Sequence, residues 1–336
     1  MRIALLEARK GFGRVSPNPA VGAILVRNGN IAARGYHRAS GLPHAEIECL
    51  AAAGTRSLRS ATLYVTLEPC STTGRTPPCT DAIANAGVKR VVIGATDLNP
   101  AHEGRGVRQL EKAGIEVTTG VLARECSRLN EAFNKWIVTG IPFVIAKCGM
   151  SLDGRLTRPP GEGQWLTGAS TRRQARELRG SVDAILIGAE TLRQDNPRLT
   201  PRGIRGAKQP WRVILTRSGK LPNDAEVFTD RCADRTMVFQ GKRLAAVLRD
   251  LGRKEVTSVL IEGGGDVLGQ AFDGKLVDKI QFYVAPLLTG GPVIAVAANG
   301  AAATIAGARL DDVRYERIGS DIRVAGYPRW GAATAE

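Results

Sequence analysis

Three absences narrow the class of protein before any motif is considered. No stretch approaches the roughly 20 consecutive apolar residues of a membrane-spanning helix, so no membrane partner is expected. The first residues, MRIALLEARKG, carry a charge every few positions and lack the continuous apolar core of an export signal, which predicts a cytoplasmic location. Aromatic residues make up only 5% of the chain, and no basic stretch is interleaved with them, which weakens the case for a surface that stacks single-stranded bases.

Acidic residues are also in short supply. The 336 residues include 47 Lys and Arg against 32 Asp and Glu, a formal net charge of +15. Such an excess indicates an anionic partner, which could be a nucleic acid, a phosphorylated metabolite or a phosphorylated cofactor. Charge alone does not choose among them. At about 150 residues per domain, the length predicts two domains, each large enough for its own core.

The glycine-rich fingerprint of a standard Rossmann fold is missing as well. Gly11-Phe12-Gly13 follows a predicted helix rather than a strand, so a nucleotide cofactor would be bound by another α/β fold. A different glycine run, Gly263-Gly264-Gly265, lies between a predicted strand, Ser258–Ile261, and a predicted helix, Val267–Phe272. Backbone N–H groups in that arrangement can bind phosphate, although a tight turn explains such a run about as often.

The residues of a zinc-dependent deaminase, by contrast, are all present. His44, Cys70 and Cys79 offer one imidazole and two thiolates, which leaves the fourth position of a tetrahedral zinc for water. Glu46 is not a ligand and can move protons between that water, the ring nitrogen and the departing ammonia. A disulfide between the two cysteines is disfavoured because nothing predicts export. The remaining cysteines are expected to be inert thiols: Cys49, Cys126, Cys148 and Cys232.

Predicted strands and helices alternate along both halves of the chain, which favours α/β folds around a largely parallel sheet. The first half is predicted to contain helices Ile3–Lys10, His44–Gly54, Thr80–Ala86, Val107–Ala113 and Glu125–Val138, and strands Val21–Val26, Ile31–Arg34, Ala61–Leu67 and Arg90–Ala95. The second half is predicted to contain strands Phe143–Cys148, Ala184–Ile187 and Arg212–Leu215, helices Thr171–Arg179 and Leu244–Leu251, and a closing strand Lys279–Val284. Because the pattern breaks and restarts around Gly140 and Pro142, we expect domains at residues 1–140 and 141–336.

The metal ligands would meet where helices begin and a strand ends. His44 and Cys79 open predicted helices, and Cys70 directly follows the predicted strand Ala61–Leu67. The partial positive charge of a helix N-terminus favours thiolate over thiol. At a helix start the chain can also turn His44 and Glu46 toward one pocket. His102 belongs to no motif and is expected to be exposed.

Two sets of motifs occur in order along nearly the whole chain. The first half contains Ser16-Pro17-Asn18-Pro19-Ala20-Val21-Gly22, His37, His44-Ala45-Glu46, Glu68-Pro69-Cys70-Ser71 and Gly74-Arg75-Thr76-Pro77-Pro78-Cys79. The second contains Lys147, Ser151-Leu152-Asp153-Gly154-Arg155, Gln164-Trp165-Leu166-Thr167, Asp195-Asn196-Pro197-Arg198-Leu199-Thr200 and Ile261-Glu262-Gly263-Gly264. Together they resemble the bifunctional deaminase-reductase family of riboflavin biosynthesis. Eight residues separate the zinc cysteines, unlike the Pro-Cys-x-x-Cys of nucleic-acid deaminases.

The resemblance implies both a fold and a reaction sequence. A cytidine-deaminase-like α/β/α sandwich would be followed by a dihydrofolate-reductase-like α/β domain. The first would use zinc to deaminate 2,5-diamino-6-(5-phosphoribosylamino)pyrimidin-4-one. The second would use NADPH to reduce the ribosyl chain to ribityl. The anionic partners are then phosphorylated pyrimidines and NADPH rather than nucleic acid, and a homo-oligomer is compatible with the sequence.

The resemblance also assigns roles to particular residues. The metal would be held by His44, Cys70 and Cys79, with Glu46 as the proton shuttle. Substrate contacts would come from Asn18, His37, Lys147, Arg179, Asp195, Leu199, Arg202 and Glu262. The NADPH side would be formed by Gly149, Trp165, Thr167, Thr191, Thr216, Gly263, Gly264 and Gly265. Taken alone, Asn18 could merely shape a turn, His37 could be a surface histidine and Arg202 could be a solvated charge.

Two departures from the family pattern leave alternatives open. Thr72 and Thr73 stand where the family commonly carries one or two histidines, and threonine can hydrogen-bond but carries no charge. Gly163 stands where a serine usually contacts substrate, a loss of about 0.5 to 1.5 kcal/mol. One rival interpretation is a nucleic-acid deaminase with a binding module. Another is a chain in which one of the two activities has been lost.

Overall fold

The computed structural model describes residues 1–54, 58–72, 77–157, 162, 165–203, 206–300 and 307–331. The motifs and departures above include six residues that lie outside these ranges: Thr73, Gly74, Arg75, Thr76, Gly163 and Gln164. The chain divides into two compact units, Met1–Gly140 and Ile141–Glu336, and each is described by itself. No helix in the described part of the chain is both long enough and apolar enough to cross a membrane.

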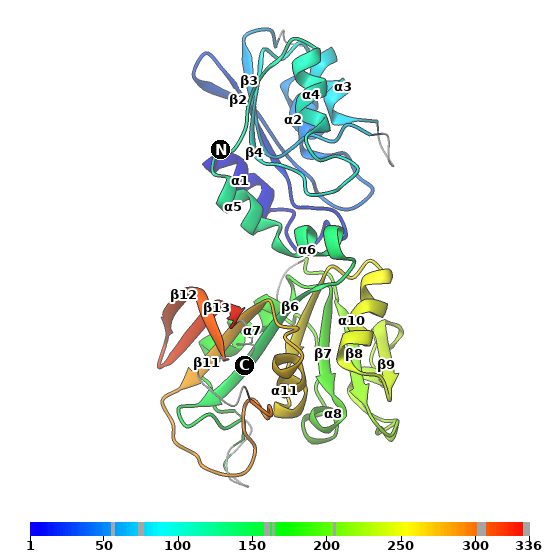
Figure 1. Ribbon diagram of the computed structural model, residues 1–336, viewed down its shortest axis with the longest axis vertical. Coiled ribbons are helices and arrows are strands. Elements are labelled where there is room, and N and C mark those ends of the chain that lie inside the picture. The colour runs from blue at the N-terminus through cyan, green and yellow to red at the C-terminus, as the bar shows by residue number, and fades with distance from the viewer. Residues whose placement is uncertain are drawn as a thin grey trace, which may run out of the picture. The chain divides into compact units, whose positions relative to one another are not determined.

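The first unit is a three-layer α/β/α sandwich (Figure 1). Its elements are α1 (Arg2–Arg9), β1 (Gly22–Arg27), β2 (Asn30–Tyr36), α2 (Ala45–Ala53), β3 (Ala61–Leu67), α3 (Cys79–Asn85), β4 (Arg90–Ala95), α4 (Arg105–Lys112), β5 (Glu116–Thr118), α5 (Ala123–Leu129) and α6 (Glu131–Thr139). The sheet has the order β2-β1-β3-β4-β5, with α2, α3 and α4 on one side and α1 and α5 on the other.

This sheet is less parallel than the sequence predicted. β1 pairs antiparallel with both β2 and β3, and only the β3–β4 and β4–β5 pairs are parallel. The hairpin over Asn28-Gly29 causes the first antiparallel pair, since both residues adopt the positive φ that a tight turn requires. A Cβ on Gly35 of β2 would lie 2.3 Å from the Ala45 carbonyl oxygen, so only glycine lets α2 pack this closely.

The predicted helix Glu125–Val138 is in fact two helices, α5 and α6, separated at Asn130. The Asn130 side chain is 5% exposed. Its oxygen accepts from the backbone N–H of Ala20 at 2.8 Å, and its amide donates to the Ala20 carbonyl at 3.0 Å. A tertiary contact across 110 residues thus breaks a helix that local periodicity would continue.

The second unit contains an eight-stranded sheet in the order β12-β13-β11-β6-β10-β7-β8-β9. Its elements are β6 (Phe143–Ser151), α7 (Ala169–Arg179), β7 (Ala184–Gly188), α8 (Ala189–Asp195), β8 (Trp211–Thr216), α9 (Glu226–Thr229), the 3-10 helix η1 (Ala233–Arg235), β9 (Thr236–Gln240), α10 (Leu244–Arg253), β10 (Ser258–Glu262), α11 (Gly265–Asp273), β11 (Lys279–Ala285), β12 (Ala308–Ile318) and β13 (Asp321–Trp330). The pairs from β11 to β9 are parallel, while β13 pairs antiparallel with β11 and β12.

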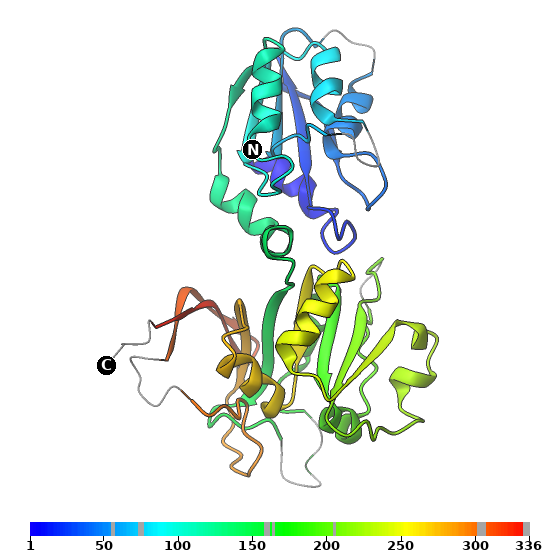
Figure 2. The same ribbon diagram turned by 45° about the vertical axis from the view of Figure 1, so that its right-hand side comes forward.

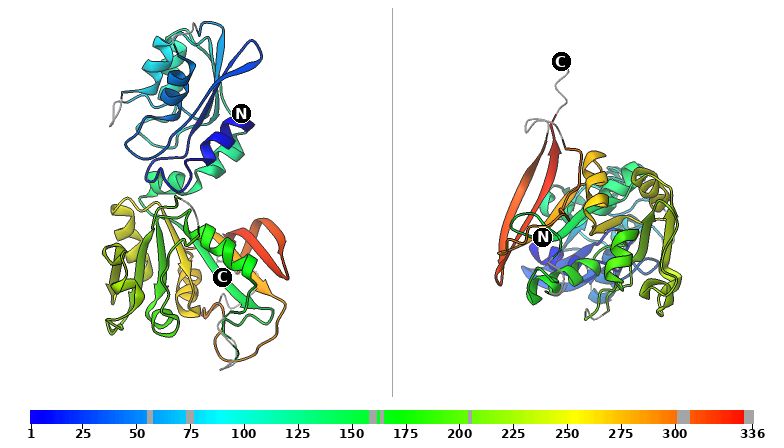
Figure 3. Two further views of the ribbon diagram at one scale, coloured as in Figure 1. Left: turned by 180° about the vertical axis from the view of Figure 1, so that it is seen from behind. Right: turned by 90° about the horizontal axis from the view of Figure 1, so that it is seen from below.

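The prediction that Lys279–Val284 closes the second fold is wrong. The hairpin of β12 and β13 continues the sheet beyond β11 and forms its edge (Figure 2). The helices cover the parallel strands of the sheet. α10 and α11 pack on one face of these strands, and α7 covers the opposite face (Figure 3). This layering leaves the carboxyl ends of β6, β10, β7 and β8 side by side at one edge of the sheet.

Candidate active sites

The predicted metal ligands of the first unit converge. One ligand atom each from His44, Cys70 and Cys79 lies within 4.8 Å of the others. His44 precedes α2, Cys70 follows β3 and Cys79 is the first residue of α3. The Cys79 backbone N–H also donates to the Cys70 sulfur at 3.4 Å, which stabilises negative charge on that sulfur.

The spacing of the three ligand atoms fits zinc. His44 Nδ1 lies 3.5 Å from Cys70 Sγ and 3.3 Å from Cys79 Sγ. A tetrahedral zinc with its usual bond lengths places a nitrogen and a sulfur ligand about 3.5 Å apart. One nitrogen and two sulfur donors are also a set that zinc prefers, so the residues present can hold the ion.

Electrostatics at the cluster follow from this close approach. A hydrogen bond from the Cys79 thiol, more than any other contact, lowers the pKa of Cys70. The same bond, together with burial, raises the pKa of Cys79. The hydrogen bond with Cys70 raises the pKa of His44. Because metal ligands bind in their deprotonated forms, a metal ion at this site displaces protons from the cluster.

Glu46 lies in the first turn of α2, two residues after His44. In the described part of the chain, it is not one of the three residues whose ligand atoms form the cluster. Its side chain is only 3% exposed. Burial, followed by the negative charge of Cys70, raises the pKa of Glu46 to about 7. A carboxyl group with a pKa near neutrality can both accept and return a proton.

Asn18 and His37 also lie at this site, and His37 is buried rather than on the surface. The rings of His37 and His44 are 5.2 Å apart, edge to face. Burial lowers the pKa of His37, which favours the neutral ring. Its Nδ1 donates to the Pro43 carbonyl at 3.0 Å, which leaves Nε2 to accept from the Asn18 amide at 3.1 Å. This chain of contacts fixes the orientation of the Asn18 amide.

Sequence reasoning missed the role of Glu68 and misjudged His102. Glu68 stood within a quoted motif, and its place at the end of a buried strand was the one signal available. Its side chain is 3% exposed and accepts several backbone N–H groups. The expectation that His102 is exposed is wrong, because its ring is half-buried and its Nδ1 lies 3.4 Å from Thr72 Oγ1.

In the second unit, three predicted substrate residues lie together: Glu262, Arg179 and Lys147. Glu262 is the last residue of β10. Arg179 from α7 pairs with both carboxylate oxygens, at 2.6 and 2.8 Å, and Lys147 on the neighbouring β6 lies 3.6 Å away. Burial acts to raise the pKa of Glu262, but Arg179 and then Lys147 outweigh it and lower the pKa to about 2. One carboxylate faces two cations here, so the centre keeps a net positive charge.

The predicted NADPH residues fall into two groups along the same sheet edge. In one, a Cβ on Gly149 of β6 would lie 3.3 Å from Thr167. The Thr167 carbonyl accepts from Arg172, whose guanidinium lies over the exposed Trp165 ring at 5.4 Å. The exposed Trp165 ring lies two residues before Thr167, which borders Gly149, and a flat exposed ring can accommodate a planar ligand.

The second group surrounds the start of α11. Gly263 and Gly264 have φ values of +97° and +61°, and Cβ atoms there would lie 3.4 and 3.2 Å from Thr191. A Cβ on Gly265 would lie 2.2 Å from a carbonyl oxygen. Only glycine suits these backbone positions, and the cradle beside a helix N-terminus fits a phosphorylated cofactor. Thr216, at the end of β8, is 4% exposed and accepts from a backbone N–H of the following turn.

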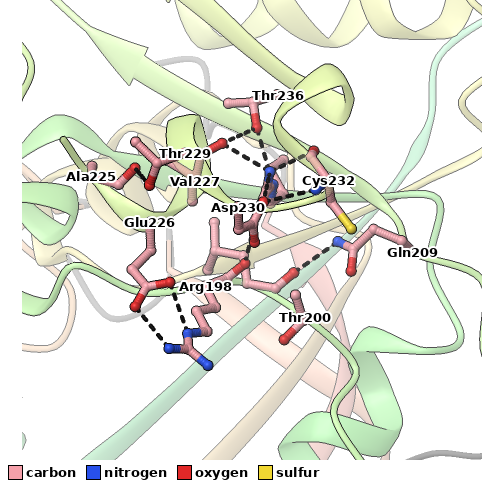
Figure 4. A network of polar contacts seen from close by, with 12 residues as sticks. Arg198, Thr200, Gln209, Ala225, Glu226, Val227, Thr229, Asp230, Cys232 and Thr236 are labelled. Atoms are coloured by element: carbon pink, nitrogen blue, oxygen red, sulfur yellow. Dashed lines mark hydrogen bonds and ion pairs between the residues drawn. The ribbon is translucent and has the colours of Figure 1, made fainter. Parts of the chain in front are cut away.

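The remaining predicted substrate residues lie at the end of α8 and in the segment that follows it. Asp195 and Arg202 are exposed, whereas Leu199 is 1% exposed and has a φ of +49°. Figure 4 shows the polar network that holds this segment, in which the Leu199 carbonyl accepts from Gln209 and the exposed Arg198 pairs with Glu226.

A fully buried arginine, Arg212 of β8, lies at the centre of that network. It donates to both carboxylate oxygens of Asp230, to the Thr236 hydroxyl and to the carbonyls of Val227 and Cys232, at 2.5 to 3.0 Å. It also donates to the Arg198 carbonyl at 3.3 Å. Sequence reasoning gave Arg212 no role, since a single arginine in a strand carries no sign of its partners.

Comparison with family models divides the chain along the same lines. Residues 1–95 match the cytidine and deoxycytidylate deaminase zinc-binding region. Residues 142–324 match the RibD C-terminal domain. The fold and the sites therefore define a bifunctional enzyme, a zinc-binding deaminase joined to a reductase.

The relatives extend over the full length. The riboflavin biosynthesis protein RibD of Synechocystis is 38% identical over 97% of this chain and 95% of its own length. That of Bacillus amyloliquefaciens is 37% identical over 98% and 96%. The chain belongs to the RibD family. A solved structure of Acinetobacter baumannii RibD has a TM-score of 0.89 at 34% identity, with 98% of this chain and 97% of that one covered.

Proposed function

We propose that the first unit removes the 2-amino group of 2,5-diamino-6-(5-phosphoribosylamino)pyrimidin-4-one, and that the second reduces the ribosyl chain with NADPH. The product would be 5-amino-6-(5-phosphoribitylamino)uracil. The observation that carries the proposal is the zinc-ligand cluster with the buried Glu46 beside it. A structural relative from Thermotoga maritima, 34% identical with a TM-score of 0.88, is named as a diaminohydroxyphosphoribosylaminopyrimidine deaminase and 5-amino-6-(5-phosphoribosylamino)uracil reductase.

In the deaminase, zinc when bound would supply a water of lowered pKa at its open fourth position. Glu46 would take a proton from that water and deliver protons to the ring nitrogen and the leaving ammonia. The Asn18 amide, oriented by His37, would hold the pyrimidine ring. Small, fully buried Ala45 leaves room for the ring beside His44.

In the reductase, NADPH when bound would supply the hydride. The cofactor would lie along Gly149, Thr167 and Trp165 and across the Gly263–Gly265 cradle to Thr191 and Thr216. Lys147 and Arg179 would bind the phosphorylated substrate, with Glu262 holding both cations in place. Asp195 at the end of α8, with Leu199 and Arg202 in the segment that follows, would complete the substrate side.

The same proposal covers partners and location. Phosphorylated pyrimidines and NADPH account for the net charge of +15 without a nucleic acid. The 2′-phosphate of NADPH offers this basic chain a contact that NADH lacks, so NADPH should bind more tightly at moderate salt. Six free cysteines, two of them zinc ligands, suit a reducing compartment, and we place the enzyme in the cytoplasm.

One assay separates the proposal from a chain with a single activity. The diaminopyrimidine substrate is supplied with and without NADPH, and ammonia release and NADPH oxidation are followed independently. Ammonia should appear in both cases, and NADPH should be consumed only after deamination. No ammonia from the zinc-loaded protein would refute the deaminase, and ammonia without NADPH oxidation would refute the reductase. NADH serves as the control cofactor.

A second experiment tests the assignment of one activity to each half. A fragment ending near Thr139 should release ammonia without NADPH, and one beginning near Ile141 should reduce the deaminated substrate without zinc. Circular dichroism and cooperative melting identify fragments that are folded. A well-folded second fragment that neither binds NADPH nor reduces substrate, while the full chain does both, would contradict the assignment.

A further inference from the structure

The segment that follows α8 in the second unit, residues 196–203, is held through its backbone. Three successive carbonyl groups of this segment each accept a hydrogen bond from a side chain outside it: those of Arg198, Leu199 and Thr200. The donors, in the same order, are Arg212 at 3.3 Å, Gln209 at 3.1 Å and Arg179 at 3.5 Å. Three side chains therefore fix the course of the backbone on which Leu199 lies.

Leu199, the middle residue of the three, needs this support. Its φ of +49° lies in the left-handed region, which a residue with a side chain adopts only at a cost in free energy. Its side chain is 1% exposed, so relaxation of the backbone that turned Leu199 outward would expose apolar surface to water. The contacts around Leu199 therefore determine whether this conformation persists.

Gln209 is the donor that acts on Leu199 itself. Its Nε2 donates to the Leu199 carbonyl at 3.1 Å and to the Pro210 carbonyl at 3.0 Å, so both amide hydrogens are used (Figure 4). The bond to Pro210, a buried residue, orients the amide toward Leu199. Gln209 is half-buried, whereas Arg212 is fully buried within its network. Loss of the Gln209 amide should therefore cost the fold far less than loss of Arg212.

The same segment is connected to the charged centre of the second unit. Arg179 donates to the Thr200 carbonyl through Nη1 and pairs through Nε and Nη2 with the two carboxylate oxygens of Glu262, at 2.6 and 2.8 Å. Lys147 lies 3.6 Å from the same carboxylate. A shift of the backbone at Thr200 would therefore reach the guanidinium of Arg179 directly. The segment lies against the cations that are proposed to bind the phosphorylated substrate.

We propose that Gln209 is a positioning residue of the reductase, which acts through Leu199 and holds the 196–203 segment in the conformation that receives the substrate beside Arg179. The inference rests on the proposed function, because it presumes that the deaminated substrate binds at Leu199 and Arg179. The proposed cofactor residues all lie outside the 196–203 segment. Gln209 should therefore affect the binding of the substrate and leave the binding of NADPH nearly unchanged.

The test measures NADPH oxidation by the full chain, with the deaminated substrate and NADPH varied in turn. Gln209→Met keeps the length of the side chain but removes the donor. KM for the deaminated substrate should rise roughly 3-fold to 10-fold, the loss expected for one neutral hydrogen bond, while kcat and KM for NADPH stay within about twofold. Gln194→Met is the matched control, because it makes the same change at an exposed glutamine of α8 whose amide donates to Glu190. Both KM values should be unchanged in it.

A second variant, Gln209→Asn, keeps a polar amide but is one methylene too short to reach Leu199, and it should give the same rise in KM for the substrate. A kcat near that of the wild type reports that a variant is folded. Equal rises in KM for the substrate and for NADPH would overturn the proposal, because Gln209 would then support the fold of the unit as a whole. An unchanged KM for the substrate in both variants would overturn it as well. If the wild-type chain oxidises no NADPH with the deaminated substrate, the proposed function itself fails, an outcome distinct from variants that match an active wild type.

Discussion

The two units assemble their chemistry in opposite ways. In the first, two thiols, an imidazole and a carboxyl group lie close together, and a metal cation would balance the charge of the ligands in their deprotonated forms. In the second, Glu262 is already balanced by Arg179 and Lys147, and the surplus positive charge favours an anion. The first site has the donors to hold a metal, and under the proposed function the second binds phosphorylated ligands. The comparison shows how one basic chain can serve both.

The largest expected effect is a loss of deaminase activity in the first unit, with the reductase activity of the second unit unchanged. Glu46→Gln should lower ammonia release about 10²- to 10⁴-fold, because the amide cannot carry the proton that the carboxyl group moves. Metal analysis should still find one zinc per chain, since Glu46 is not among the ligands. NADPH oxidation with deaminated substrate should be unchanged. Near-normal ammonia release would remove Glu46 from the mechanism.

The next largest expected effect is a loss of folding stability that is confined to the second unit. Arg212→Met removes a fully buried guanidinium that donates to the Asp230 carboxylate and to the carbonyls of Val227, Cys232 and Arg198. Breaking a buried ion pair in this way costs about 3–5 kcal/mol of unfolding free energy. Urea denaturation followed by fluorescence measures the loss, and ammonia release should persist. A loss below about 1 kcal/mol would show that the network is dispensable.

The pH dependence of stability should also differ between the units. The ordinary pKa of Glu262 is 4.5 and its folded value is about 2, so the folded state is stabilised above pH 4.5. That stabilisation, about 3 kcal/mol, is lost as pH falls from 4.5 toward 2. Urea denaturation of the wild type across this range should reveal it in the second unit. Glu262→Gln should lose that dependence, and an unchanged slope in the variant would contradict the assignment.

The smallest expected effect serves as a comparison for the Arg212→Met experiment. Arg198 and Glu226 belong to the same network, but their side chains are 49% and 35% exposed. Exposed ion pairs contribute about 0.2–1 kcal/mol, so Glu226→Gln should barely change the unfolding free energy. Denaturation of the two variants side by side gives the measurement. Equal losses in both would mean that burial does not decide the strength of these contacts.

The sequence predicted best what is encoded locally. Strands Ala61–Leu67 and Arg90–Ala95 match the structure at both ends, because both are short apolar runs bounded by turns. The deaminase ligands were also found, since each lies at the start of a helix or the end of a strand within a short motif.

The rest depends on partners far away in the sequence. β12 and β13 were missed because most of their residues are exposed or half-buried and no apolar alternation marks them. The contact between Thr72 and His102 joins residues 30 apart in the sequence, and Glu68 accepts from the backbone N–H groups of Asp97 and Gly104 on either side of His102. The place of Lys147 beside Glu262 is likewise set by the register of β6 against β10, which periodicity does not specify.

The two hydrogen bonds between the Asn130 side chain and the Ala20 backbone determine how long a deaminase fragment has to be. The family match for this region ends at residue 95, before α5 and α6 begin. A fragment cut there would leave the buried peptide groups of Ala20 without partners, next to the turn that carries Asn18. A deaminase fragment for fusion to another protein should therefore extend to the end of α6, even though the metal ligands and Glu46 all lie before residue 80.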